Sequence, residues 1–424
     1  MNSSQKQLLI HISLFVITLF TTTFAGVEWM YSKYLFWVDD EFLMTWNDFV
    51  RGLEFSLPFL AILTFHEFGH YFTARYHHIK VTLPYYIPFW LGFILIPSFG
   101  TMGAMIRIKE HIYSLKHYFD VGISGPLAGF VIALGVIWYG FANLPEPEYI
   151  FQIHPEYEQF GNDYAEHVYN YEFRREIDSL NYIKRRKADS LAVITNPEKE
   201  WQGYPEFKPR EEYSAGYFSK PLLFVLVEKF VVSSDDQYKI PSDQEIMHYP
   251  FLMAGLLALL FTGLNLFPIG QLDGGHILFG MVGPRRHEII SKVIYTLLLF
   301  YAGLGVVTIH SFMVWEIESM SWLSFWMIMY LYLLYKCAQS LFNEDINRWL
   351  YATVIFALQF LLNYLFGIQG YWGWLLFAFI LGRYLGVIHP PVVDQRPLSL
   401  GRHLLGWIAL IVFILSFSPK PMIL

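Results

Sequence analysis

Apolar residues along this chain gather in runs that are long enough to cross a lipid bilayer as helices, which needs about 20 residues each. One long polar stretch, 143–247, separates two groups of such runs. Nine spans are predicted, at roughly 8–27, 53–73, 119–142, 248–268, 288–309, 320–340, 349–366, 371–388 and 404–419. The pattern therefore predicts an α-helical polytopic membrane protein with about nine transmembrane helices.

Two apolar stretches need a separate interpretation. The stretch 83–99 contains three prolines, which interrupt helices, so it is predicted to be re-entrant or interfacial. The first run resembles a signal peptide up to about residue 25, but it is long for one and has only Lys6 before it. We therefore expect the first run to be a retained span.

The composition agrees with a membrane protein and narrows the chemistry. Charged residues make up 15% of the 424 residues and apolar residues 55%, whereas a soluble domain has about 25% charged residues. The net charge of −7 offers no basic surface to nucleic acid. Cys337 is the only cysteine, which excludes an intramolecular disulfide and a cysteine-based zinc site. The 15 histidines are therefore the expected metal ligands.

Positive charges in the short loops indicate the orientation, because cytoplasmic loops carry an excess of Lys and Arg. With the N-terminus inside, the inner loops contain most of these residues, among them Arg75, Lys80 and Arg107. The outer short segments contain only Lys33, Arg51 and Lys420. The polar stretch 143–247 is then extracytoplasmic.

Two histidines lie one helical turn apart inside the second predicted span, in the sequence His66-Glu67-Phe68-Gly69-His70. The i, i+4 spacing places both imidazoles on one helix face, where they can bind one zinc ion beside a glutamate that can take a proton. Ionisable residues inside a membrane span are costly and usually functional. Polar side chains that reach the membrane interface are the alternative.

A third ligand is expected where the fourth predicted span breaks. Pro268 interrupts the helix, and Asp273 is the only acid in the apolar segment that follows Asn265. A buried carboxylate is costly unless it is paired, and a catalytic zinc ion commonly has three protein ligands. Two alternatives remain open, namely Asp273 as the N-cap of the next helix and His276 as a rival ligand.

These residues resemble the two signatures of the site-2 protease family of intramembrane zinc metalloproteases. One signature is the His-Glu-x-x-His helix, and the other is the Asn-x-x-Pro…Asp-Gly segment at 265–274. The stretch Gly122–Gly129 resembles the glycine- and proline-rich motif on the intervening span, although its plainer interpretation is close helix packing. The resemblance covers roughly 53–283 and is to the branch without a PDZ domain, which includes bacterial and chloroplast members.

The resemblance implies a role for each matching residue. His66, His70 and Asp273 would ligate one Zn²⁺ ion, and Glu67 would act as general base and then as proton donor. Asn265 would bind substrate or stabilise the oxyanion, and the alternative is a helix–helix hydrogen bond.

The implied activity is hydrolysis of peptide bonds within or near transmembrane segments of membrane-anchored substrates, or regulated intramembrane proteolysis. The implied location is a bacterial inner membrane with the active site towards the cytoplasm. The lipid bilayer and transmembrane protein substrates are the expected partners, nucleic acid is not, and the oligomeric state stays open.

The predicted organisation follows from these motifs and the polar stretch. Within that stretch, 165–191 is predicted to be a charged helix and 217–232 an interfacial helix, and no PDZ-type module is expected. The five regions are a first helix with an outer loop (1–52), the first half of a catalytic core (53–142), an extracytoplasmic insert (143–247), the second half of the core (248–287) and additional helices (288–424).

A short strand is predicted near the expected zinc site. Between 99 and 110, Ala104, Ile106 and Ile108 alternate with polar residues or glycine, which is typical of a strand in a small membrane-associated β element. A substrate could be held open by adding to its edge. An amphipathic loop is the alternative.

Three other functions remain possible from the sequence. Prenyl-protein proteases also carry His-Glu-x-x-His but use a glutamate as third ligand. A catalytically inactive zinc-binding scaffold or chaperone would usually lack Glu67, which is present here. A metal transporter would scatter ligands over several spans, whereas His11, Lys292 and Asn363 form no spaced pattern.

Overall fold

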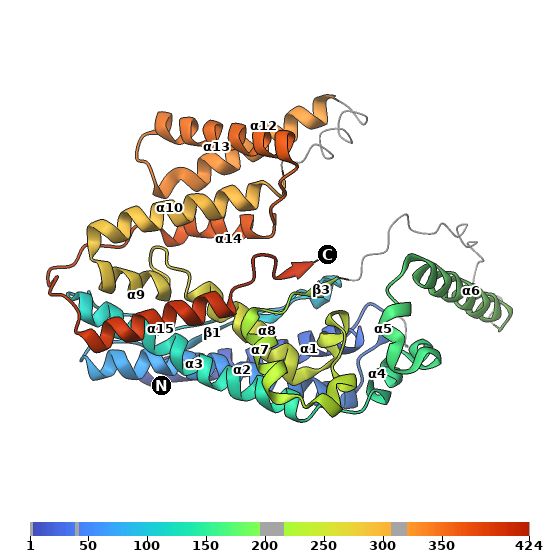
Figure 1. The fold of residues 1–424 in the computed structure, drawn as a ribbon. Helices are drawn as coiled ribbons and strands as arrows, with labels where there is room; N and C mark the ends of the chain where they lie inside the picture. Colours follow the sequence, from blue (N-terminus) through green and yellow to red (C-terminus); the bar gives the residue numbers. More distant parts are fainter. Residues whose placement is uncertain (1–2, 39–41, 196–215, 307–319, 424) are drawn as a thin grey trace.

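A computed structural model describes residues 3–38, 42–195, 216–306 and 320–423 of the chain (Figure 1). The described part is mostly helical, with two small two-stranded sheets. The end of the predicted span at 288–309 and part of the predicted insert lie outside the described residues. The helices that build the core are α1 (Ser3–Tyr31), α2 (Trp46–Tyr76), α3 (Leu115–Ala142), α8 (Pro250–Asn265) and α9 (Asp273–Val282).

Four of the described helices are long and apolar enough to cross a membrane, namely α1, α2, α3 and α13 (Asp345–Phe366). Shorter apolar helices are α8, the stretch Trp374–Leu385 and α15 (Leu400–Ser416). Helices α10 (Pro284–Gly303) and α12 (Met320–Cys337) occupy two further predicted spans. The chain is therefore a multi-pass membrane protein, and the number of nine spans stays a prediction.

Helix α2 begins at a capping box that its sequence encodes. The Thr45 hydroxyl accepts from the backbone N–H of Asp48, and the Asp48 carboxylate accepts from the backbone N–H of Thr45 at 2.9 Å. Lys33 Nζ donates to the same carboxylate at 2.9 Å. A 31-residue helix is about 46 Å long and therefore exceeds the hydrocarbon core of about 30 Å.

A β-hairpin lies against α1 and α2. Strand β1 (Tyr85–Phe89) pairs antiparallel with β2 (Gly100–Met105), and the Thr21 hydroxyl of α1 donates to the Gly100 carbonyl at 2.7 Å. The strand predicted within 99–110 is thus confirmed up to Met105. The stretch predicted as re-entrant or interfacial contributes β1 and a 3-10 turn.

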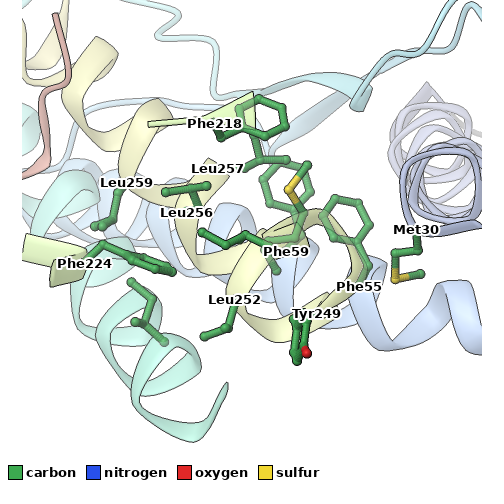
Figure 2. Close-up of a cluster of buried hydrophobic side chains, with 14 of the residues drawn as sticks. Met30, Phe55, Phe59, Phe218, Phe224, Tyr249, Leu252, Leu256, Leu257 and Leu259 are labelled. Atoms are coloured by element: carbon green, nitrogen blue, oxygen red, sulfur yellow. The ribbon is translucent and has the colours of Figure 1, made fainter. Parts of the chain in front are cut away.

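Large apolar side chains fill the half of the core next to the insert, as Figure 2 shows. Because lipid is itself apolar, such contacts hold membrane helices together mainly by close packing. These side chains come from α1, α2 and α8, and from β3 (Tyr217–Phe218) and α7 (Leu222–Val231). Figure 2 labels Met30, Phe55, Phe59, Phe218, Phe224, Leu252 and Leu256 among them.

The predicted insert forms short helices and one long one. The charged helix predicted at 165–191 is present as α6, shifted by several residues, and the helix predicted within 217–232 is present as α7. Figure 1 shows α6 projecting away from the core. The helices and 3-10 turns before α8 are α4 (Glu148–Ile153), Pro155–Asp163, α5 (Tyr164–His167), α6 (Tyr171–Thr195), α7, Ser234–Lys239 and Asp243–His248.

The C-terminal helices form a second packed layer beside the core. Helices α10, α12, α13 and α14 (Trp374–Ile380) lie together in Figure 1, around the fully buried Tyr295. A π-turn at Leu381–Leu385 follows α14. Helix α15 returns to the core, where Ala409 and Val412 pack with Ile277 of α9. The chain then ends in β4 (Met422–Ile423), which pairs with β3.

Candidate metal centre

Helix α2 brings two imidazoles together inside the protein. His66 and His70 are both 7% exposed, and their Nε2 atoms lie 3.1 Å apart. The His70 Nδ1–H donates to the carbonyl of Val121 on α3 at 2.7 Å. In this tautomer the lone pair of Nε2 is available, and metal-binding histidines are usually oriented in this way.

The third predicted ligand lies directly opposite this pair. Asp273 Oδ2 is 3.3 Å from His66 Nε2 and 3.2 Å from His70 Nε2. A zinc ion bound by three atoms at 2.0–2.2 Å in tetrahedral geometry holds them about 3.3–3.6 Å apart. The three side chains therefore fit a zinc ion by both their chemistry and their spacing.

The break between α8 and α9 places Asp273. Helix α8 ends at Asn265 and α9 begins at Asp273, so the predicted break is confirmed. Gly270 turns the chain with φ +56°, and a Cβ there would lie 2.0 Å from the carbonyl oxygen of Gly386. The residue at the N-cap position is Leu272, so the alternative of Asp273 as N-cap is wrong.

Glu67 lies at the edge of this triad. It is 6% exposed, and its Oε1 is 4.0 Å from His66 Nε2. The backbone of Ile106, just after β2, lies beside its carboxylate. The carboxylate is therefore held beside the three ligand atoms without being one of them, as a proton acceptor should be.

The glycine-rich face of α3 makes room for the two imidazoles. A Cβ at Gly125 would lie 2.1 Å from His70 Nε2, and one at Gly129 would lie 3.0 Å from His66 Cβ. The interpretation of this motif as a close-packing surface is confirmed. The glycines allow α3 to pack directly against the side chains of His66 and His70.

Two other predicted residues lie nearby in different ways. Asn265 Nδ2 is 3.4 Å from His66 Nε2, so the structure brings this amide to the triad. His276 instead makes a 2.8 Å hydrogen bond between its Nδ1 and Nε2 of His389, and it does not join the triad. Burial lowers the pKa of His389 to about 4, which keeps that imidazole neutral.

Sequence reasoning missed the backbone groups that orient the site. The Val121 carbonyl and the Ile106 backbone carry no signal in residue type, since every residue offers such groups. His389 lies 113 residues after its partner in a connecting segment, and no spacing pattern links the two. Among the positions that orient the site, only Gly125 could be recognised in the sequence, as part of the glycine- and proline-rich motif.

Comparison with known proteins gives one family. Residues 54–308 match the profile of peptidase family M50. The chain is 25% identical over 258 residues to a rice (Oryza sativa subsp. japonica) protein named "Probable zinc metalloprotease EGY1, chloroplastic", covering 60% of this chain and 32% of that protein. It is 23% identical over 283 residues to the EGY2 protein of Oryza sativa subsp. indica, covering 67% and 38%.

These similarities concern the core and leave much of each relative unmatched. The EGY1 protein of Arabidopsis thaliana is 22% identical over 260 residues, which cover 61% of this chain and 35% of that protein. The chain spans about a third of the length of the curated relatives it matches. No solved structure gives a significant match. The profile covers more than half of the chain and includes all three residues of the triad, so the chain belongs to peptidase family M50, the site-2 protease family.

Proposed function

We propose that this protein is an intramembrane zinc metalloprotease that hydrolyses peptide bonds within or near transmembrane segments of membrane-anchored substrates. One observation carries the proposal, namely the convergence of His66, His70 and Asp273 with 3.1–3.3 Å between their ligand atoms. The family to which the chain belongs supports it.

Each residue has a defined task in this proposal. His66, His70 and Asp273 hold the zinc ion, which when bound supplies a Lewis acid for the scissile carbonyl and an acidified water. Glu67 accepts a proton from the attacking water and returns it to the leaving amine. Asn265, whose amide lies beside His66, binds substrate or stabilises the developing oxyanion.

The hairpin is the proposed substrate guide. A substrate helix hides its carbonyls in hydrogen bonds and must unwind before hydrolysis, and an added strand keeps it extended. Strand β2 supports this role because the residue that follows it, Ile106, lies beside Glu67. Met102 and Met105 on β2 are more than half exposed, so this strand is accessible at both side chains.

The proposed location is a membrane in which the triad faces the cytoplasm. Arg75 lies in the last turn of α2, beyond His70, and Lys80 follows that helix, whereas the acidic residues Glu146 and Glu148 follow the far end of α3. A bacterial inner membrane fits this orientation. In a plastid the equivalent side is the stroma, and the relatives of this chain are named as chloroplast proteins.

Labelling of single cysteines tests the orientation after Cys337 is replaced. Arg285→Cys, at an exposed position of α10, should react only when the inner side is accessible. Glu158→Cys, at an exposed position of the insert, should react from outside. The reversed pattern would contradict the proposed topology.

The insert at 143–247 is proposed to select substrates or to gate their lateral entry, and a plain packing cap is the alternative. It supplies α6, which projects from the core in Figure 1. Deletion of 171–212 should leave zinc binding intact and change which substrates are cut. Unchanged selectivity would favour the packing cap, and loss of zinc would show that the region is needed for folding.

The activity is tested by comparing two Glu→Gln variants on one helix. Glu67→Gln should bind zinc as the wild type does and cleave a model transmembrane substrate about 10²–10⁴-fold more slowly. Glu54→Gln, exposed and more than three turns earlier on α2, should cleave normally. Equal cleavage by Glu67→Gln and the wild type would refute the role of Glu67, whereas zinc binding without cleavage by the wild type would favour a zinc-binding scaffold or a transporter.

A further inference from the structure

A second group of potential metal ligands lies in the insert, apart from the triad of α2 and α9. His154, Glu245 and His248 place their side-chain donor atoms close together. His248 Nε2 is 3.1 Å from Glu245 Oε2 and 3.2 Å from His154 Nε2, and His154 Nε2 is 3.8 Å from Glu245 Oε2. These separations are close to those of the first triad.

The cluster is built where the insert returns to the membrane core. Glu245 and His248 are three residues apart on one 3-10 turn, a spacing at which side chains are eclipsed on the same face. His154 directly follows α4, 94 residues earlier in the chain. The Tyr149 hydroxyl donates to the His248 carbonyl at 2.6 Å and ties these two segments together.

The other ring nitrogen of each histidine is already engaged. His248 Nδ1 donates to the carbonyl of Met30 at the end of α1, and His154 Nδ1 is 3.5 Å from Glu156 Oε1. Metal-binding histidines are usually oriented by such contacts to carbonyls or carboxylates. Both Nε2 lone pairs then face Glu245 Oε2, so three electron-rich atoms converge on one point.

Burial makes this convergence costly without a cation. Glu245 is 3% exposed and His248 is 6% exposed, and the Tyr169 hydroxyl donates to the second carboxylate oxygen of Glu245. With Nδ1 of His248 occupied, Nε2 can donate to Glu245 only if the ring is charged. Without a metal ion, the cluster must hold an additional proton or use the other tautomer of His154, whose Nε2–H would donate to His248 Nε2.

We propose that His154, Glu245 and His248 bind a second divalent transition-metal ion of the zinc class. Two imidazoles and one carboxylate are a ligand set that suits zinc, and the 29% exposed side chain of His154 leaves access for a fourth ligand such as water. This inference does not depend on the proposed proteolytic activity.

The second ion has a structural task in this arrangement. It joins the end of α4 to the segment before α8, and the Met30 carbonyl links His248 to the outer end of α1. Met30 itself packs in the buried cluster of Figure 2. Helix α2 begins next to the C-terminal end of α1. His66 lies 20 residues further along α2, about 30 Å from its first residue. The two sites are therefore at opposite ends of the core.

The test measures zinc bound to the full chain in detergent, after chelation and reloading. His66→Ala removes one ligand of the first triad and should retain about one equivalent of zinc. The double variant His66→Ala/His154→Gln should retain none. His66→Ala/His167→Gln is the matched control, because His167 is an exposed histidine of the same insert, and it should keep its zinc.

Equal zinc contents in His66→Ala with and without His154→Gln would overturn the proposal and leave a hydrogen-bond network without a metal ion. If the double variant does not fold, Co²⁺ decides the question in His66→Ala alone. A visible d–d absorption band of bound tetrahedral Co²⁺ is expected, and its absence would overturn the proposal. Neither readout requires cleavage, so a failure of the proposed activity remains distinguishable.

Discussion

The inner site (His66, His70 and Asp273) and the outer site (His154, Glu245 and His248), named after the proposed topology, each contain two imidazoles and one carboxylate but differ in what surrounds them. At the inner site, Glu67 lies beside the triad as a carboxylate that is not a ligand, and its Oε1 is 4.0 Å from His66 Nε2. At the outer end, Glu245 is itself part of the cluster and Glu156 contacts His154 through Nδ1. The inner site therefore has a group that can transfer protons, whereas the outer site has groups only for binding an ion.

The two clusters also differ in how they are built. His66 and His70 lie on one long helix that is packed on α3 through glycines, so their spacing is rigid. The outer ligands come from a helix end and a 3-10 turn that are 94 residues apart in the chain. An ion should therefore matter more for local order at the outer end and more for chemistry at the inner end.

Removal of an inner ligand should have the largest effect. Asp273→Ala and His66→Ala should each lose the inner zinc and reduce cleavage to background, because a two-ligand site binds the ion too weakly. The outer site should keep its equivalent of zinc in both variants. Full zinc occupancy in purified His66→Ala, meaning as much as in the wild type, would show that the triad is misassigned.

A methyl group on the glycine face of α3 should have the next largest effect. Gly125→Ala places its Cβ 2.1 Å from His70 Nε2, so the imidazole must move, and cleavage should fall about 10²-fold. Gly135→Ala on the same helix meets no atom within 4 Å and should cleave normally. Similar rates for the two variants would mean that the position of His70 is not critical.

Chelation should distinguish the two ends by local order. Removing an ion present at 100 times its dissociation constant costs about 2.7 kcal/mol, which is about 100-fold in an opening equilibrium. Hydrogen exchange should therefore accelerate strongly at 148–157 and 243–249, while the amides of α2 and α3 change little. Uniform acceleration over both regions would remove the contrast between them.

The smallest effect is expected from the carboxylate that orients His154. Glu156→Gln should weaken zinc binding at the outer site about tenfold, which is a small effect for a residue that orients a metal ligand. The effect is small because Glu156 Oε1 is 3.5 Å from His154 Nδ1. Inner-site zinc and cleavage should not change. Zinc titration of Glu156→Gln in the His66→Ala background measures this effect, with exposed Glu158→Gln as its control.

The inner site could be predicted from the sequence because its ligands obey local rules. The i, i+4 pair lies on one helix, and Asp273 is the only acid in an apolar segment with a helix-breaking proline. The break, the strand at β2 and the helices α6 and α7 were predicted for the same kind of reason, although their boundaries were displaced by several residues.

The outer cluster could not be predicted, because its parts are assembled by tertiary contacts. His154 and His248 are 94 residues apart, and the Glu245–His248 pair is meaningful only once the turn at Asp243–His248 is known. The hydrogen bond from His248 to the Met30 carbonyl involves a backbone group that no sequence pattern marks. Long-range convergence of this kind depends on how the insert packs on α1 and α8.

The most direct test of intramembrane hydrolysis at the inner triad is the position of the bond that is cut. A single-span substrate and the zinc-loaded protein are reconstituted together in lipid vesicles, and the products are identified by mass spectrometry. We predict a new C-terminus inside the span, in the half nearest the side on which Arg285 is accessible, and no such product after chelation. Cleavage only in the soluble flanks of the substrate, or cleavage inside the span that persists without zinc, would contradict the proposed activity.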